Sequence, residues 1–349
     1  MTNQATEERV LDAIGQRREL VNDAIDDELP MAEPERLYEA SRYILEAGGK
    51  RLRPTVTLIA AEAVTDVPPL STPYREFPAL GGADAFDLMR AAVSIEVIQS
   101  FTLIHDDIMD EDDLRRGVPA VHEQYDVSTA ILAGDTLYSK AFEIMTETGA
   151  DPAAGLEAMR TLASTCTKIC EGQALDVAFE ERDDILPDEY LEMVELKTAV
   201  LYGAAAATAG ILTGADEEVV DALYRYGIDS GCAFQIQDDV LDLTVPSEQL
   251  GKQRGSDLVE DKETLITLHA RQQGVDVDDL VDAETPAEVT EAEVDEAVAA
   301  LEEVGSIDYA RDTAEDLTAR SKDHLSVLPD NEARSLLEDI ADYLISRGY

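Results

Sequence analysis

The sequence has 349 residues, 45% of them hydrophobic, which excludes a disordered chain and supplies enough apolar material for a sizeable core. Its 76 acidic and 27 basic residues give a formal net charge of -49 at pH 7. A surface this acidic repels nucleic acid and anionic membranes, and concentrated salt screens its self-repulsion. We therefore expect a halophilic protein that binds no nucleic acid.

The chain opens with the polar segment MTNQATEERV, which has no apolar signal core, so we expect a cytoplasmic protein. From there, apolar residues recur at helical spacing in segments that cover most of the chain. The predicted helices span residues 7–26, 37–47, 86–105, 128–148, 156–170, 190–212, 217–241 and 331–345. The sequence thus predicts an all-α fold.

We expect a single domain over residues 1–349. Prolines and glycines gather in a predicted loop insertion at 66–85, and helical spacing resumes directly after it. Residues 274–306 are strongly acidic with little apolar face, which predicts a solvated peripheral insertion.

Two further features bear on location. The uncharged run 198–215 consists mostly of small residues, so it predicts a close-packed central helix and no stable membrane insertion. Cys166 and Cys170 have no partner pair at zinc-site spacing, and with Cys232 they are predicted to be buried thiols in a reducing compartment.

The segment GGKRLRP (48–54) reverses the charge of the chain locally, with Lys50, Arg51 and Arg53 close together. The two glycines allow the backbone to approach a ligand, and Pro54 can start a helix whose N-terminus favours phosphate. A second basic pair, Arg115 and Arg116, follows an acidic cluster. The pattern predicts an anion site.

Two acidic clusters end apolar helical segments. LIHDDIMDEDD places Asp106 and Asp110 one helical turn apart, and FQIQDDVLD does the same for Asp238 and Asp242. Either cluster alone could be a solvated run in so acidic a chain. Together with the basic segment, they predict hard oxygen ligands for magnesium, which completes its shell with water and substrate phosphates.

The sequence resembles the trans-polyprenyl diphosphate synthases. The resemblance spans nearly the whole chain and rests on ordered motifs: GGKRLRP, HDDIMDEDDLRRG (105–117), GQALD (172–176), LKT (196–198), FQIQDDVLD (234–242) and GKQRGSDLVEDKET (251–264). It implies a single large helical bundle of the isoprenoid synthase type, with a central substrate cavity, and a homodimer.

The resemblance also implies the roles of individual residues. Asp106, Asp110 and Asp238 would hold about three Mg²⁺ ions, assisted by Asp107 and Asp242. The allylic diphosphate would meet Arg115, Lys197 and Lys262, with Lys252 nearby. Isopentenyl diphosphate would meet Lys50, Arg53, Arg116 and Gln99, and Thr198 and Gln235 would turn oxygen dipoles toward the carbocation.

The implied reaction is ionisation of an allylic diphosphate, attack by the double bond of isopentenyl diphosphate, and proton loss. One aromatic residue beside a small one, Phe101 and Thr102, resembles the pattern of enzymes with a C20 product, so we expect geranylgeranyl diphosphate. A C15, mixed C15 and C20, or C25 product stays open. Outside the family, the acidic motifs also leave open a class I terpene cyclase, a class that lacks GGKRLRP, and a catalytically silent or cation-buffering protein.

Two residues depart from the family pattern. Asp261 stands before Lys262, where the family usually has glycine, and Ile266 stands where proline is common. Both affect the expected loop geometry and leave the expected activity unchanged.

Overall fold

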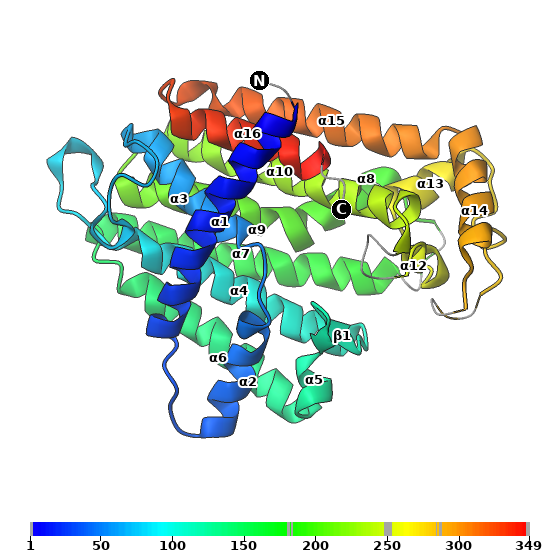
Figure 1. Cartoon of the computed structure of the whole chain (residues 1–349), viewed down its shortest axis with the longest axis horizontal. Coiled ribbons are helices and arrows are strands. Elements are labelled where there is room, and N and C mark those ends of the chain that lie inside the picture. Colours follow the sequence, from blue (N-terminus) through cyan, green and yellow to red (C-terminus); the bar gives the residue numbers. More distant parts are fainter. Residues whose placement is uncertain are drawn as a thin grey trace. The chain divides into compact units, whose positions relative to one another are not determined.

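The structure is a computed structural model that describes residues 3–179, 182, 184–247, 253–283, 285 and 288–346. Almost every element in it is a helix, as Figure 1 shows. The predicted all-α fold is confirmed.

The fifteen α-helices described are α1 (Asn3–Glu28), α2 (Glu35–Glu46), α3 (Leu52–Thr65), α4 (Leu88–Met109), α5 (Val121–Gln124), α6 (Val127–Thr146), α7 (Pro152–Phe179), α8 (Pro187–Val194), α9 (Val200–Thr213), α10 (Glu217–Thr244), α12 (Ser256–Val259), α13 (Leu265–Gln272), α14 (Glu291–Glu303), α15 (Ser306–His324) and α16 (Glu332–Ser346). Short 3-10 turns are η1 (Tyr74–Glu76), η2 (Leu80–Gly82) and η4 (Leu325–Val327), and a π-turn, η3 (Glu195–Ala199), joins α8 to α9. Strands β1 (Leu114–Arg115) and β2 (Val118–Pro119) pair in an antiparallel hairpin. Each predicted helix is present, and 190–212 is helical throughout as α8, η3 and α9.

The chain divides into two compact units, each made of several segments. The first comprises Met1–Cys166, Ala204–Tyr224 and Leu325–Asp339, and the second comprises Thr167–Gly203, Arg225–His324 and Ile340–Tyr349. We refer to them as the first and second units.

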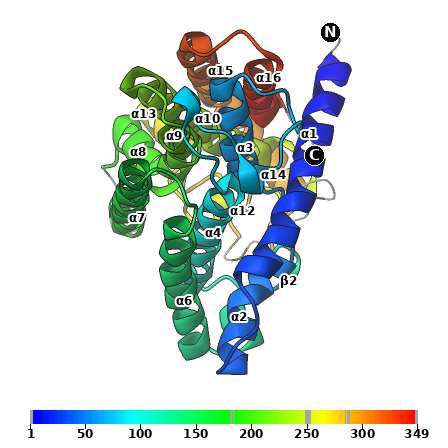
Figure 2. The same ribbon diagram turned by 90° about the vertical axis from the view of Figure 1, so that its left-hand side faces the viewer.

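Helix α4 is the centre of the first unit. It is buried over most of its length because apolar residues are distributed all around it. The Asp87 carboxylate caps it by accepting a hydrogen bond from the Arg90 amide at 3.1 Å. Helix α6 lies beside it (Figure 2), and Gly134 makes this approach possible. A Cβ atom at Gly134 would lie 2.3 Å from Nε2 of His105.

Glycines also set the packing of the second unit. A Cβ at Gly172 of α7 would lie 2.3 Å from the Lys197 amide nitrogen, and one at Gly231 of α10 would lie 2.7 Å from Cα of Ala199. Both glycines therefore press their helices directly onto the π-turn η3, which carries Lys197 and Thr198. Any larger residue would move this turn.

Helix α14 belongs to the acidic segment predicted to be a solvated insertion. It buries Val294, Ala297 and Leu301, which follow one another at helical spacing. The segment therefore contributes a narrow apolar face to the second unit, while its many carboxylates remain in solvent.

Within the described residues, one stretch, Pro187–Thr213, is long and apolar enough to cross a membrane, but 83% of its most apolar window is buried inside the protein. The prediction of a close-packed central helix is confirmed. The prediction of three buried cysteines is wrong for Cys170, which is exposed, whereas Cys166 and Cys232 are buried. The buried stripe of α7 passes through Cys166, Ile169 and Gln173 at a spacing of three and four residues, which leaves Cys170 beside the stripe.

Candidate functional site

The basic segment 48–54 forms the turn between α2 and α3. Gly48 and Gly49 have φ values of +97° and +146°, which side chains disfavour, and α3 begins at Leu52 with Pro54 in its first turn. A Cβ at Gly49 would lie 3.0 Å from the guanidinium carbon of Arg116. The Arg116 guanidinium donates to the carbonyl oxygens of Gly48 and, at 3.1 Å, Ile44. The glycines thus bring together two basic segments that are far apart in the sequence.

Arg51 differs from its basic neighbours. Its side chain is buried and donates to Oε1 of Glu96 at 2.5 Å, to Oδ1 of Asn22 at 2.9 Å and to the carbonyl of Leu45 at 2.6 Å. It therefore fastens the turn to α4 and α1, whereas Lys50 is exposed and Arg53 is half-buried. Lys50 and Arg53 remain the cations of this segment that a ligand can reach.

Several guanidinium groups surround Arg116. Much of its side chain is exposed, but loss of water around the guanidinium lowers its pKa, and the positive charges of Arg51, Arg115 and Arg53 lower it further against the raising effect of Glu96. Arg51 is paired with Glu96 and Arg115 is paired with Asp107 and Asp112, whereas the guanidinium of Arg116 donates to backbone carbonyl oxygens. The cluster favours an anion with several acceptor oxygens.

The hairpin presents this second basic pair. Arg116 and Gly117, at its two-residue turn, have φ values of +55° and +79°, as in a type I′ turn. Arg115 precedes the turn, and its Nε donates to Oδ1 of Asp107 at 2.6 Å, while its Nη2 donates to Oδ2 of Asp112 at 2.7 Å.

The first acidic cluster lies at the C-terminal end of α4. Asp106 is half-buried and Asp110, which caps the helix, is exposed, so two carboxylates one turn apart face outward. Asp107 is fully buried. Burial raises the pKa of Asp107, although Arg115 opposes this, and among the described residues its Oδ2 atom has no hydrogen-bond partner. The two outward carboxylates of α4 are hard oxygen ligands that suit a hydrated divalent cation.

The second acidic cluster lies near the end of α10. Asp238 is half-buried, whereas Asp242 is fully buried and accepts hydrogen bonds from Oγ of Ser256 at 3.0 Å and the Asp257 amide at 3.2 Å. Asp242 thus holds the start of α12 in place. Its predicted role as a ligand that assists metal binding remains a prediction. Asp238 belongs to the second unit and Asp106 to the first, and the meeting of the two clusters at one site remains a prediction as well.

The π-turn η3 carries the predicted LKT residues. Nζ of Lys197 pairs with Oδ2 of Asp176 on α7, and Oγ1 of Thr198 lies 3.4 Å from Oε1 of Gln235 on α10. The structure therefore brings Thr198 and Gln235 together, and their role toward a carbocation remains a prediction. Asp176 ends the GQALD motif but was not among the predicted site residues.

The last predicted cations are Lys252, which lies outside the described residues, and Lys262, whose side chain is half exposed and pairs with Glu260 at 2.8 Å. Asp261 has a φ of +51°. This left-handed conformation explains why glycine is the expected residue there, and aspartate is one of the few others that tolerate it.

Sequence reasoning missed Tyr190 and Asp239. Asp239 is buried between the hydroxyl of Tyr190, which donates to its Oδ2, and the amide of Gln235, whose Nε2 donates to its Oδ1 at 3.1 Å. Burial raises the pKa of both Tyr190 and Asp239, and the charge of Asp257 raises that of Asp239 further. The two adjacent aspartates of the DDVLD motif drew attention to Asp239. Nothing in the sequence indicated that its role differs from that of Asp238.

The residues predicted to set product length lie one after the other on α4. Thr102 is buried and its hydroxyl donates to the carbonyl of Gln99 at 2.9 Å, while Phe101 is half-buried. The Phe101 ring meets the imidazole of His105, with centroids 4.9 Å apart, and the ring of Tyr138 on α6. No sequence pattern had connected α6 with these residues.

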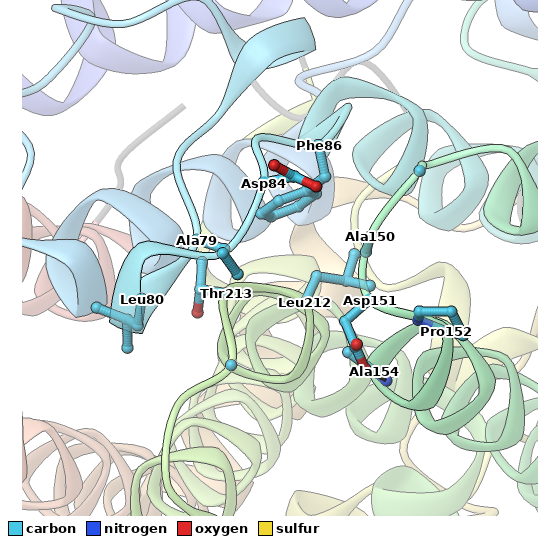
Figure 3. Close-up of a pocket in the computed structure, with 13 residues that line it drawn as sticks. Ala79, Leu80, Asp84, Phe86, Ala150, Asp151, Pro152, Ala154, Leu212 and Thr213 are labelled. Carbon is cyan, nitrogen blue, oxygen red and sulfur yellow. Dashed lines mark hydrogen bonds between the residues drawn. The ribbon is translucent and has the colours of Figure 1, made fainter.

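A pocket of about 530 Å³ lies elsewhere in the first unit, between the loop before α4, the start of α7 and the end of α9 (Figure 3). Asp84, Phe86, Asp151 and Leu212 line it. Helix α4 separates it from Asp106 by roughly 27 Å at 1.5 Å per residue. The pocket is therefore remote from the first acidic cluster.

Within the described residues, no three His, Cys, Asp or Glu side chains form a ready-made metal site.

Residues 34–301 match the model of a protein family described as polyprenyl synthetase. The chain is 64% identical to a geranylfarnesyl diphosphate synthase of Natronomonas pharaonis over 98% of this chain and 99% of that protein. It is 49% identical to a geranylgeranyl diphosphate synthase of Methanosarcina mazei over 97% of this chain and 98% of that one.

Solved structures are similar over their full length. A geranylgeranyl pyrophosphate synthetase of Pyrococcus horikoshii gives a TM-score of 0.86 at 36% identity, with 98% of this chain and 99% of that chain covered. The corresponding protein of Geoglobus acetivorans gives 0.83 at 43% identity, with 96% and 99% covered. The two chains have the same all-helical fold as this one.

Proposed function

The chain belongs to the polyprenyl synthetase family and is a prenyltransferase, and on this premise we propose that it makes geranylgeranyl diphosphate for isoprenoid lipids. Its substrates would be isopentenyl diphosphate and the allylic dimethylallyl, geranyl and farnesyl diphosphates. The observation that carries the proposal is the contact of Arg116 with Gly48 and Gly49, which gathers four arginines in a chain with only 27 basic residues.

Different residues would bind the two diphosphate substrates and the metal ions. Lys50, Arg53, Arg116 and Gln99 would bind isopentenyl diphosphate, and Arg115, Lys197, Lys262 and Lys252 would bind the allylic diphosphate. Mg²⁺, held by Asp106, Asp110 and Asp238 with help from Asp107 and Asp242, would neutralise the leaving diphosphate. The outward carboxylates of α4 fit such an ion, and Asp107 has one carboxylate oxygen without a hydrogen-bond partner among the described residues.

Each cycle would break one carbon–oxygen bond and form one carbon–carbon bond. The allylic carbon loses its diphosphate, the isopentenyl double bond attacks the cation, and the product loses a proton to the departing diphosphate. Oxygen dipoles of Thr198 and Gln235, 3.4 Å apart, would stabilise the cation. No side-chain nucleophile is needed.

Product length has two candidates. Phe101 supports a C20 product, because a bulky ring before the first acidic cluster would limit the length of the product chain, and the Tyr138 ring packs against it. The relative named geranylfarnesyl diphosphate synthase, at 64% identity, favours a C25 product as the second candidate. Both fit the same residues for ionisation and condensation.

We also propose a halophilic, cytoplasmic homodimer. The exposed face of α6 carries Val127, Ile131 and Leu132, which are 49%, 43% and 57% exposed in a chain whose surface is otherwise rich in carboxylates. An apolar stripe of this kind supports association with a second copy. Light scattering in molar potassium chloride would give twice the chain mass of 38.0 kDa.

The decisive experiment incubates the protein with radiolabelled isopentenyl diphosphate and each allylic diphosphate, in molar potassium chloride with Mg²⁺. The dephosphorylated products are then separated by chromatography. A dominant C20 alcohol supports the proposal, and a dominant C25 alcohol supports the second candidate. No labelled alcohol with any starter would overturn both.

A further inference from the structure

The two neighbouring aspartates of the α10 motif have different surroundings. Asp238 is half-buried, whereas Asp239 is only 6% exposed and both of its carboxylate oxygens are engaged. Oδ2 receives the Tyr190 hydroxyl, and Oδ1 receives Nε2 of Gln235 at 3.1 Å. Asp239 is thus directed into the second unit, toward protein groups.

This contact decides which way the Gln235 amide points. The amide has a donor end and an acceptor end that differ little in shape, so only its partners select between two orientations. Oδ1 of Asp239 is an acceptor whether or not the carboxyl carries a proton, because the Tyr190 hydroxyl can either donate to Oδ2 or accept from it. The NH₂ end must therefore face Asp239, and Oε1 is turned to the Thr198 side.

Tyr190 makes the arrangement rigid. It is 2% exposed, it lies on α8, and α8 continues directly into the π-turn that carries Thr198. The four side chains therefore form a closed path: Tyr190 to Asp239, Asp239 to Gln235, Gln235 to Thr198, and back along the chain to Tyr190. Gly231 presses α10 against Ala199 of the same turn, which fixes the distance across the path.

We propose that Asp239, held by Tyr190, is a positioning residue that fixes the Gln235 amide with its oxygen toward the reacting allylic carbon. The proposal rests on the proposed function, because an oxygen dipole assists only where positive charge develops. Asp239 would act through Gln235, without touching substrate or metal.

The kinetic test compares Asp239→Ala with the conservative Asp239→Asn. Asparagine keeps an acceptor for Gln235 and a group for Tyr190, so we expect nearly unchanged turnover, whereas alanine should lower kcat about 100-fold with little change in KM for either diphosphate. The Mg²⁺ concentration for half-maximal rate should stay the same in both variants. If Asp239→Asn were as damaging as alanine and shifted the Mg²⁺ requirement, Asp239 would be a metal ligand and the proposal would be overturned.

A double-mutant cycle tests the route of action. In a Gln235→Leu background, Asp239→Ala should add less than about twofold to the loss, because the amide that it orients is already absent. Additive losses would overturn the proposal. Tyr190→Phe, which keeps the ring and the packing, gives a second arm of the cycle and should lower kcat about tenfold.

A readout without substrate separates this proposal from the proposed function. In ligand-free protein labelled with ¹⁵N-glutamine, the Gln235 side-chain signal is assigned by its loss in Gln235→Leu. Its NH₂ protons should exchange slowly with water in the wild type and in Asp239→Asn, and rapidly in Asp239→Ala. Equal exchange in all three would overturn the positioning, whereas a wild type that forms no prenyl product would overturn the proposed function.

Discussion

The rings of Phe101 on α4 and Tyr138 on α6 lie with their centroids 5.2 Å apart and their planes at 62°. Tyr138 in turn meets Phe142, with centroids 5.1 Å apart, so an aromatic row crosses from one helix to the other. Edge contacts of this kind contribute roughly 0.5–1.5 kcal/mol beyond buried area. The row limits how far the Phe101 ring can turn aside.

Product length should therefore respond to both helices. Phe101→Ala is expected to shift the products toward longer chains, because it removes the bulky aromatic ring five residues before Asp106 on α4. Tyr138→Ala should shift them in the same direction by a smaller amount, and Tyr138→Phe, which keeps the ring, should not shift them. Chromatography of the dephosphorylated alcohols measures the shift, and an unchanged pattern in Phe101→Ala would remove this residue from length control.

Asp106→Ala should lower kcat by roughly 1,000-fold, because it removes a carboxylate expected to hold Mg²⁺. The matched control is Asp113→Ala, which removes the same charge from an exposed position beyond the helix end. Raising Mg²⁺ should restore part of the activity of the first variant and leave the control unchanged. Normal turnover in Asp106→Ala would contradict the metal assignment.

Gly49→Ala should weaken binding of isopentenyl diphosphate. The added methyl group would lie 3.0 Å from the Arg116 guanidinium, and the φ of +146° disfavours a side chain, so the turn and Arg116 must both shift. We expect the KM for isopentenyl diphosphate to rise about tenfold, a change of about 1.4 kcal/mol, with little change for the allylic substrate. Gly15→Ala, where nothing lies within 4 Å of the new Cβ, is the control and should behave as wild type.

The cysteines should differ sharply in reactivity. Burial first, and then the charges of Glu195 and Asp229, raise the pKa of Cys232 to about 12. At pH 8 its thiolate is scarce because the pH lies far below that pKa, so alkylation should be slow, whereas exposed Cys170 should react first. Mass spectrometry of iodoacetamide-treated protein should show one fast site that Cys170→Ser removes, and a fast reaction at Cys232 would contradict its burial.

The loop before α13 offers a stability test. Asp261→Ala should lower the free energy of unfolding by about 1 kcal/mol, because alanine tolerates a φ of +51° poorly. Asp261→Gly should stay within about 0.5 kcal/mol of wild type, since glycine adopts this conformation without strain. Denaturant titration in molar potassium chloride measures both, and equal losses would show that the loop does not impose this backbone conformation.

The helices and the charged motifs could be read from the sequence, because helical spacing and local reversals of charge are properties of short segments. The sequence could not show in which direction each of two neighbouring side chains points. Lys50 and Arg51 are both basic, yet Arg51 pairs with Glu96 while Lys50 is exposed. Asp238 and Asp239 are identical residues, yet Asp239 accepts from Tyr190 while Asp238 is half-buried. Asp238 and Asp239 differ by about 100° around α10, and Lys50 and Arg51 lie in a turn where Arg51 has a φ of +52°. In both places tertiary contacts decide which residue is buried.

Contacts between segments that are far apart in the chain could not be predicted from the sequence either. The meeting of Arg116 with Gly49, and of Tyr138 with Phe101, depends on how hairpin and helices pack. The exposure of Cys170 follows from the course of one buried stripe along α7, which composition alone does not reveal.

The division of the chain into interleaved segments has a consequence for biosynthesis. The first unit includes Leu325–Asp339 and the second includes Ile340–Tyr349, so neither has all its parts until residue 339 has been synthesised. Domains that are contiguous in sequence can fold one after another during synthesis. In this chain neither unit can finish folding before its last segment has been synthesised. A truncation shortly before residue 325 would leave both units incomplete.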